Sequence, residues 1–145
     1  MGPTLLQDGV RLTLTIILDK LVEIYPTVEA HWILIRNTLD GGSANAKTAD
    51  WPWYGGIYFD MRTTEGGSTT EPGNTSATLP YWVKASRSGS TFSSYVSPDG
   101  VNWTQLGTSQ TITMNQTVYV GLAANSGSTT ASATATFDNV SITMP

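Results

Sequence analysis

The sequence predicts an all-β fold, a two-sheet antiparallel β-sandwich. Apolar and polar residues alternate with a period of two along most of the chain, which is typical of strands that bury one face. Thr and Ser number 23 and 14 among 145 residues, beside 14 Gly and 7 Pro, a composition typical of strands joined by turns. The length suits one domain, so residues 1–145 are expected to form a single domain, with residues 1–8 as a frayed terminus or foreign residues.

The first half of the chain contains three clearly alternating segments, for which strands are expected at 12–16, 33–36 and 57–62. In the second and third of these, the odd-numbered residues are apolar and should face the core. The segment Leu18–Tyr25 is either a short helix, because its apolar residues fall at helical spacing, or a further strand. Two polar stretches, Leu39–Ala49 and Thr64–Thr78, are expected to be long loops.

The second half predicts a meander of strands with recognisable turns. Ser88–Ser90 is a short hairpin loop with a central glycine, and Ser97–Gly100 places proline and glycine where a tight turn needs them. Strands are expected at 83–87, 91–96, 101–106, 110–114, 118–123 and 131–143. The whole chain should therefore hold about nine to eleven strands.

Composition excludes several classes of function. The chain has no cysteine and a single histidine, His31. It therefore lacks the Cys and His ligands of usual zinc sites, and any Ser-His-Asp triad would have to use His31. The net charge of −4 and the seven scattered Lys and Arg residues offer no basic stripe, so nucleic acid is not expected as a partner. No run of about 18 apolar residues occurs, so the chain is expected to be soluble, with no membrane partner. His31 is expected to be a structural histidine at a sheet edge, hydrogen-bonded to a neighbour, and the alternative is a role in contacting a ligand.

Catalytic motifs are also missing from the sequence. Glycoside hydrolysis needs two facing carboxyl groups, and the seven Asp and four Glu residues include no pair at i, i+2 on a predicted strand. No nucleophile elbow, phosphate-binding loop or dinucleotide fingerprint occurs. The chain is therefore expected not to be an enzyme, although a carboxylate pair assembled by the fold stays open.

Aromatic residues supply the strongest functional signal. Five Trp and six Tyr are present, and the run Trp51-Pro52-Trp53-Tyr54 concentrates three of them. Proline favours extended geometry, which would hold the two indoles on one side as a platform for the apolar face of a sugar ring. On the next strand Tyr58, Asp60 and Arg62 should share the outer face, as should Trp32 and Arg36 on an earlier strand. The alternative is that these indoles fill one end of the sandwich.

The run Leu79–Phe92, continued by Tyr95–Thr104, resembles secreted bacterial domains of the jelly-roll, concanavalin A-like sandwich fold. The segments 117–123, 135–142 and Ile35-Arg36-Asn37 resemble other strands of such domains, so the resemblance covers roughly residues 32–143. It is closest to the β-glucan-binding modules attached to bacterial endoglucanases, carbohydrate-binding module family 81. Trp82 and Trp103 correspond to scaffold positions, whereas Trp32 and the 51–54 cluster depart from the broader pattern.

The resemblance implies an extracellular, non-catalytic module that binds β-1,4-glucan, mixed-linkage glucan or xyloglucan and is covalently linked to a glycoside hydrolase acting on plant cell wall polysaccharide. A protein-adhesion or spacer domain and a small glycosidase are the alternatives. No cofactor is required, but related modules hold a structural calcium ion, for which Asp138 is the candidate ligand. The expected ligand-binding residues are Trp32, Arg36, Trp51, Trp53, Tyr54, Tyr58, Asp60, Arg62, Lys84 and Tyr95.

Overall fold

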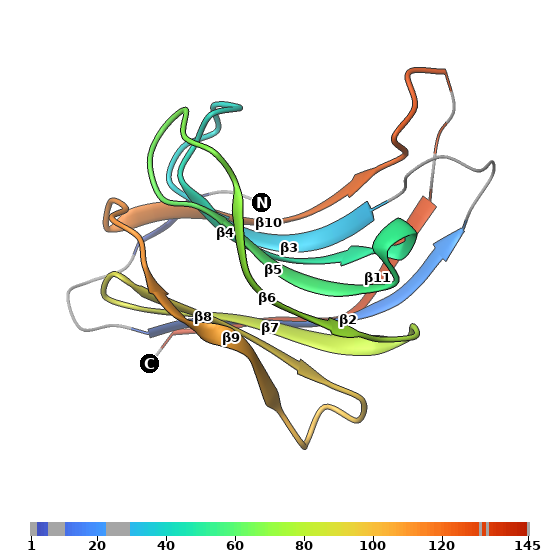
Figure 1. Cartoon of the computed structure of the whole chain (residues 1–145). Helices are drawn as coiled ribbons and strands as arrows, with labels where there is room; N and C mark the ends of the chain where they lie inside the picture. Colours follow the sequence, from blue (N-terminus) through green and yellow to red (C-terminus); the bar gives the residue numbers. More distant parts are fainter. Residues whose placement is uncertain (1–2, 6–10, 23–29, 131, 133, 145) are drawn as a thin grey trace.

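The computed structural model describes the backbone of residues 3–5 and 11–22, and both backbone and side chains of residues 30–130, 132 and 134–144. Within these residues, eleven strands form two antiparallel sheets that pack face to face (Figure 1). The predicted two-sheet antiparallel β-sandwich is therefore confirmed.

One sheet has six strands and the other has five. The six-stranded sheet has the order β1 (Pro3–Leu5), β10 (Thr117–Asn125), β3 (Ala30–Arg36), β4 (Asn45–Trp51), β5 (Gly56–Arg62) and β6 (Thr70–Ser76). The five-stranded sheet has the order β11 (Thr134–Thr143), β2 (Arg11–Val22), β7 (Tyr81–Ser88), β8 (Thr91–Ser97) and β9 (Thr104–Thr111). The short β1 lies within the segment expected to be frayed and pairs with β10.

The core lies between the sheets and consists of the residues that the period-two pattern assigned to the inner face. Ile33 and Ile35 of β3 and Ile57 and Phe59 of β5 are at most 1% exposed. From the opposite sheet, Val83 and Phe92 are among the buried residues that complete this cluster. Since successive side chains of a strand point to opposite faces, the even-numbered residues of β3 and β5 lie on the outer face of the six-stranded sheet.

Several element boundaries differ from those expected. The two segments expected to be long loops contain β4 and β6. The inward positions of β4 carry small side chains such as Ala46 and Thr48, so hydrophobic alternation is weak there. The segment from Leu18 is strand as far as Val22, where the described part of that segment ends.

Boundaries in the second half shift as well. The strands expected at 101–106 and 110–114 are replaced by the single strand β9, and the last strand starts at Thr134. Gly107 has a positive φ of 62°, and the pairing of β8 with β9 is irregular close to it, so β9 bends without ending there.

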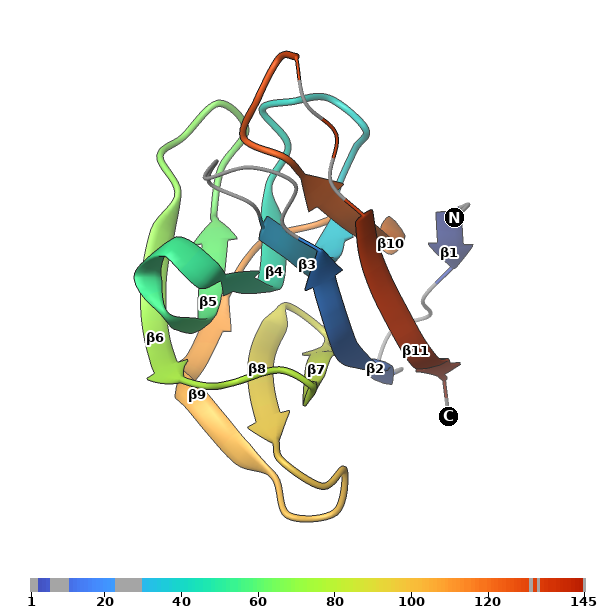
Figure 2. The same cartoon turned by 90° about the vertical axis from the view of Figure 1, so that its right-hand side faces the viewer.

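Strands β6 and β9 are the edges of opposite sheets and lie against each other. A Cβ atom placed on Gly73 of β6 would lie only 2.4 Å from the backbone nitrogen of Gly107 in β9. Glycine at these positions therefore lets the two backbones approach. Figure 2 shows β6 and β9 together at one side of the sandwich, with β1 and β11 at the other.

Candidate functional site

Four aromatic side chains form a continuous row on the outer face of the six-stranded sheet; we call Trp32, Trp51, Tyr54 and Tyr58 the aromatic row. The indoles of Trp32 and Trp51 are stacked, with ring centroids 6.1 Å apart and planes 22° from parallel. Edge-to-face contacts then join Trp51 to Tyr54 at 6.5 Å and Tyr54 to Tyr58 at 6.2 Å. These residues come from β3, β4, the following turn and β5, so the row crosses the strands.

The turn after β4 decides where the aromatic cluster points. Trp51 has φ −118° and ψ 85°, outside the helical region that the following proline disfavours, and Pro52–Tyr54 form a 3-10 helix that ends at Gly55 with a positive φ of 75°. The expectation that Trp51 and Trp53 share one side as an extended pair is therefore wrong. Trp51 is half-buried within the row, whereas Trp53 is 68% exposed and contacts no other aromatic ring among the described residues.

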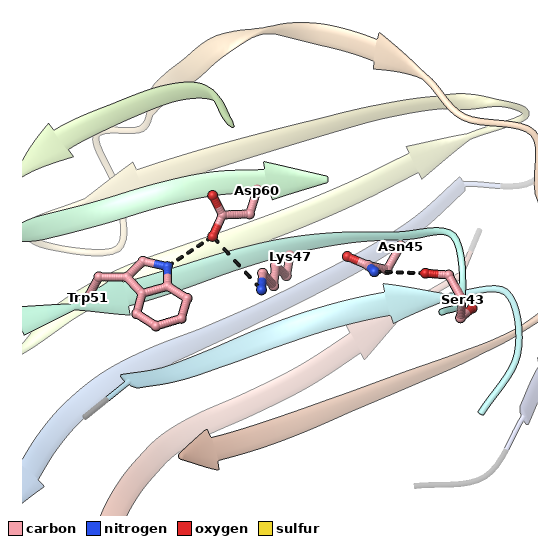
Figure 3. Close-up of polar contacts among 5 residues, drawn as sticks. All are labelled: Ser43, Asn45, Lys47, Trp51 and Asp60. Atoms are coloured by element: carbon pink, nitrogen blue, oxygen red, sulfur yellow. Dashed lines mark hydrogen bonds and ion pairs between the residues drawn. The ribbon is translucent and has the colours of Figure 1, made fainter. Parts of the chain in front are cut away.

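A polar pair, Lys47 and Asp60, lies beside Trp51 on this face (Figure 3). Trp51 donates a hydrogen bond from Nε1 to Oδ2 of Asp60 over 2.9 Å, and the same oxygen is 4.0 Å from Nζ of Lys47. The Lys47 ammonium also lies over both indoles, 5.1 Å from the ring centroid of Trp32 and 5.4 Å from that of Trp51. Lys47 was not among the expected site residues, because its strand was interpreted as a loop.

Burial shifts the pKa values of both charged groups. Burial raises the pKa of Asp60 above its usual value, an effect that Glu71 reinforces and that the Trp51 hydrogen bond and Lys47 oppose. Burial also lowers the pKa of Lys47, helped by the nearby Arg62 and opposed by Asp60. The face thus holds partly desolvated charges, whose interactions with a ligand are stronger than those of groups in bulk water.

Arg36 and Arg62 lie at one end of this face and hold the connection between β3 and β4. Arg36 donates from Nε to the carbonyl of Thr38 over 2.6 Å and from Nη2 to the carbonyl of Asp40. Arg62 donates from Nη1 to the carbonyl of Gly41 over 2.8 Å. Both guanidinium groups therefore have a structural role in addition to the ligand-binding role expected for them.

Two hollows adjoin on this face. The first hollow, of about 370 Å³, is lined mainly by β3, β4, β10 and the connections at 37–44 and 63–69, and it includes Trp32, Arg36, Lys47 and Arg62. The second hollow, of about 540 Å³, is lined by Trp51, Tyr54, Tyr58, Asp60, Glu71 and Asn74. The stacked pair Trp32 and Trp51 connects them, since one indole lines each hollow. Figure 1 shows the connection at 37–44 rising beside one end of the curved sheet.

Lys84 and Tyr95 lie elsewhere. They are cross-strand partners in β7 and β8 of the five-stranded sheet, on its outer face, with Nζ of Lys84 4.8 Å from the Tyr95 ring centroid. Nζ of Lys84 is also 4.1 Å from the ring centroid of Trp103. The other eight expected residues lie on the six-stranded sheet or in the turn after β4, so the structure does not bring all ten expected residues together.

His31 lies between the sheets, on a strand flanked by β10 and β4 and therefore not at a sheet edge. Its side chain is fully buried, with Nδ1 3.5 Å from Oδ2 of Asp50 and its ring against that of Phe137. Burial lowers the pKa of His31 to about 4 and raises that of Asp50 to about 6. A buried histidine that lines neither hollow is consistent with the structural role expected for it, but neither ring nitrogen has the expected hydrogen-bond partner among the described residues.

The candidate calcium ligand, Asp138, is exposed and accepts a hydrogen bond from the backbone nitrogen of Asn139 over 2.8 Å. Within the described part of the chain, no three His, Cys, Asp or Glu side chains are grouped so that they could hold a metal ion. Among the described residues, Asp138 therefore has no set of carboxylate neighbours of the kind that calcium sites usually use. Nor does the described chain contain a helix long and apolar enough to span a membrane.

Comparisons with known proteins agree with the fold. No protein-family model and no curated protein matches the chain. Among solved structures, a mutant of the GH43 protein BlXynB from Bacillus licheniformis matches with a TM-score of 0.68 and 20% identity, covering 88% of this chain and 26% of that one. A functionally unknown protein from Saccharomyces cerevisiae matches with a TM-score of 0.65 and 15% identity, covering 99% and 72%. These likenesses show a shared β-sandwich fold, and the chain spans about a quarter of the GH43 protein.

The comparison corrects one expectation. From its sequence the chain was expected not to be an enzyme, but part of a GH43 glycoside hydrolase has the same fold. The prediction that the chain is not an enzyme is therefore wrong, because this fold also occurs in a catalytic protein. The specific resemblance to carbohydrate-binding module family 81 finds no support in the comparisons, which show a β-sandwich fold shared with part of a GH43 protein.

Proposed function

We propose that the outer face of the six-stranded sheet binds a β-linked polysaccharide, with the aromatic row stacking on sugar rings. The observation that carries this proposal is the stacked pair Trp32 and Trp51, which lies between two hollows and beside Lys47 and Asp60. Sugar rings present flat apolar faces and a rim of hydroxyl groups, so aromatic planes with adjacent donors and acceptors match them.

The row extends over several rings, which favours a chain of sugars over a single one. Trp51, Tyr54 and Tyr58 continue from one ring to the next, and Asn74 and Glu71 of β6 border the second hollow. The ligand that we propose is a soluble β-glucan, namely β-1,4-glucan, mixed-linkage glucan or xyloglucan. We further propose that the domain acts outside the cell as part of a longer carbohydrate-active protein. There it would bind the polysaccharide and so raise the local concentration of a linked glycoside hydrolase near that polysaccharide.

Affinity electrophoresis and titration calorimetry with the three soluble glucans test the proposal. Trp51→Ala removes a central ring of the row and should weaken binding by about 30-fold or more, the loss typical of a central aromatic contact. Tyr54→Ala, at a side chain that is 67% exposed, should weaken binding less and leave the fold intact.

The matched control is Tyr95→Ala, which removes an aromatic ring from the opposite sheet. It should leave binding unchanged, although Tyr95 was among the ligand-binding residues expected from the sequence. Wild-type binding by Trp51→Ala and Tyr54→Ala, with circular dichroism unchanged, would refute the assignment of this face. Failure of the unmodified protein to bind any of the glucans would favour an adhesion or spacer domain.

A further inference from the structure

The first hollow gathers an unusual share of the positive charge of an acidic chain. The net charge is −4 and only seven Lys and Arg residues are present, yet three of them, Arg36, Lys47 and Arg62, line this one hollow. None of the residues that line it, all of which lie in the described part of the chain, is an Asp or a Glu. The second hollow has the opposite character, because Asp60 and Glu71 line it without a basic residue.

The register of the sheet explains how the three cations come together. Arg36 of β3 and Arg62 of β5 are both cross-strand partners of Asn45 in β4. The two Arg side chains therefore lie on either side of Asn45, in a line across the outer face. Lys47 follows two residues after Asn45 on the same face. The cluster therefore sits on strands, which hold side-chain positions more firmly than loops do.

The charge of the cluster is only partly balanced within the described residues. Lys47 is 4.0 Å from a carboxylate oxygen of Asp60, but neither guanidinium has a described carboxylate oxygen within that distance. The two Arg side chains donate instead to backbone carbonyls of the connection at 37–44. Among the residues that line the hollow, Arg62 and Asn45 each have a buried atom, Nε and Oδ1, without a hydrogen-bond partner among the described residues.

We infer that the first hollow is a subsite for the carboxylate of an acidic sugar, such as a uronic acid unit carried by the bound polysaccharide. A carboxylate there would balance the three cations and accept hydrogen bonds from a guanidinium and from the Lys47 ammonium. This inference rests on the proposal that the face binds glycans, and it adds the class of sugar that one end of the face accepts.

The size and position of the hollow favour an acidic sugar over a small free anion. About 370 Å³ is room for a sugar ring, and Trp32, which lines the hollow, is stacked on Trp51 of the second hollow. A polysaccharide on the aromatic row would therefore extend directly into the cationic hollow. Its neutral rings would lie against the indoles, and its carboxylate would lie between Arg36, Lys47 and Arg62.

The experiment uses one polymer in two forms: soluble mixed-linkage β-glucan, and the same glucan with a fraction of its C6 hydroxyl groups oxidised to carboxylates. Titration calorimetry at 10 mM and 150 mM sodium chloride should show the oxidised form binding at least about five-fold tighter at low salt. The advantage should shrink at the higher salt concentration, because ions screen partly exposed charges.

A matched pair of variants locates the effect without touching the cations. Leu39 lies at the hollow and is 66% exposed, so substitutions there should not disturb folding. Leu39→Glu places a competing carboxylate beside the cations and should abolish the preference for the oxidised form. Leu39→Gln, with nearly the same shape and no charge, should keep it.

Three results would overturn the inference. Equal binding of both forms at low salt would refute the acidic subsite and leave the proposed glycan-binding face standing. Binding of inorganic phosphate as tight as that of the oxidised glucan would make the hollow a small-anion site. Absence of binding to both forms would refute the inference together with the proposed function.

Tight binding of the oxidised form alone would support the inference and overturn the assignment to neutral β-glucan.

Discussion

The buried pair His31 and Asp50 predicts that two single variants respond to acid in opposite directions. Both side chains lie between the sheets, 3.5 Å apart, and Nδ1 and Nε2 of His31 have no hydrogen-bond partner among the described residues. Burial lowers the pKa of the histidine from 6.5 to about 4 and raises that of the carboxyl from 3.8 to about 6. Burial therefore disfavours the charged form of each group in the folded protein.

The effect of acid on the free energy of unfolding depends on whether the folded or the unfolded state of each group binds a proton at the higher pH. Between pH 6.5 and about 4, His31 is protonated in the unfolded chain and neutral in the folded one, so the free energy of unfolding falls as the pH falls. Between pH 6 and 3.8, Asp50 is protonated in the folded protein and ionised in the unfolded chain, so the free energy of unfolding rises as the pH falls. Each shift corresponds to about 3 kcal/mol, and in the wild-type protein the two largely offset each other.

The variants His31→Phe and Asp50→Asn separate the two contributions. Urea unfolding followed by far-ultraviolet circular dichroism at pH 7 and pH 4 gives the free energy of unfolding of each protein. Relative to wild type, His31→Phe should gain about 3 kcal/mol on going from pH 7 to pH 4, and Asp50→Asn should lose about 3 kcal/mol over the same range. Comparison with wild type cancels the contributions of the other titratable groups. Parallel pH profiles for the two variants would refute the reasoning.

Three further predictions concern other parts of the fold. Gly73→Ala places a Cβ atom 2.4 Å from a backbone nitrogen of β9 and should lower the free energy of unfolding by about 1 to 3 kcal/mol, whereas Gly41→Ala, with no atom within 4 Å of the new Cβ, should not. Hydrogen bonds from neighbouring backbone and side-chain donors hold the pKa of Asp99 well below its usual range, so Asp99→Ala should lower the melting temperature at pH 7 and the difference from wild type should shrink as the pH falls below 3.8. Trp51→Phe keeps an aromatic ring but removes the Nε1 donor to Asp60. The free energy of unfolding at pH 7, measured by urea titration, should fall by about 1 to 3 kcal/mol. An unchanged value would show that the hydrogen bond adds no stability.

The strands with large apolar residues could be predicted from the sequence, whereas those with small or polar residues could not. Ile33, Ile35, Ile57 and Phe59 give β3 and β5 a clear period of two, and these strands lie where the pattern indicated. In β4 the inward residues are small, and β6 is an edge strand of Thr, Glu, Asn and Ser residues, so hydrophobicity gave no signal. Because β4 was predicted to be a loop, Lys47 was not included in the predicted site.

Local sequence also left open which sheet each strand joins. Alternation showed that Lys84 and Tyr95 face outward, but their position on the opposite sheet depends on pairing over the whole chain. The direction of Trp53 was missed for a different reason, because the glycine after the aromatic run permits the left-handed conformation that ends the 3-10 turn.

The strands β3, β4, β5 and β6 are consecutive in the chain and adjacent in the sheet. The aromatic row, the three cations and both carboxylates of the second hollow therefore belong to one uninterrupted stretch, residues 32–74, whose strands are joined by the connections at 37–44, 52–55 and 63–69. The five-stranded sheet contributes none of these residues, so substitutions confined to this one stretch change the face and leave the opposite sheet as it is.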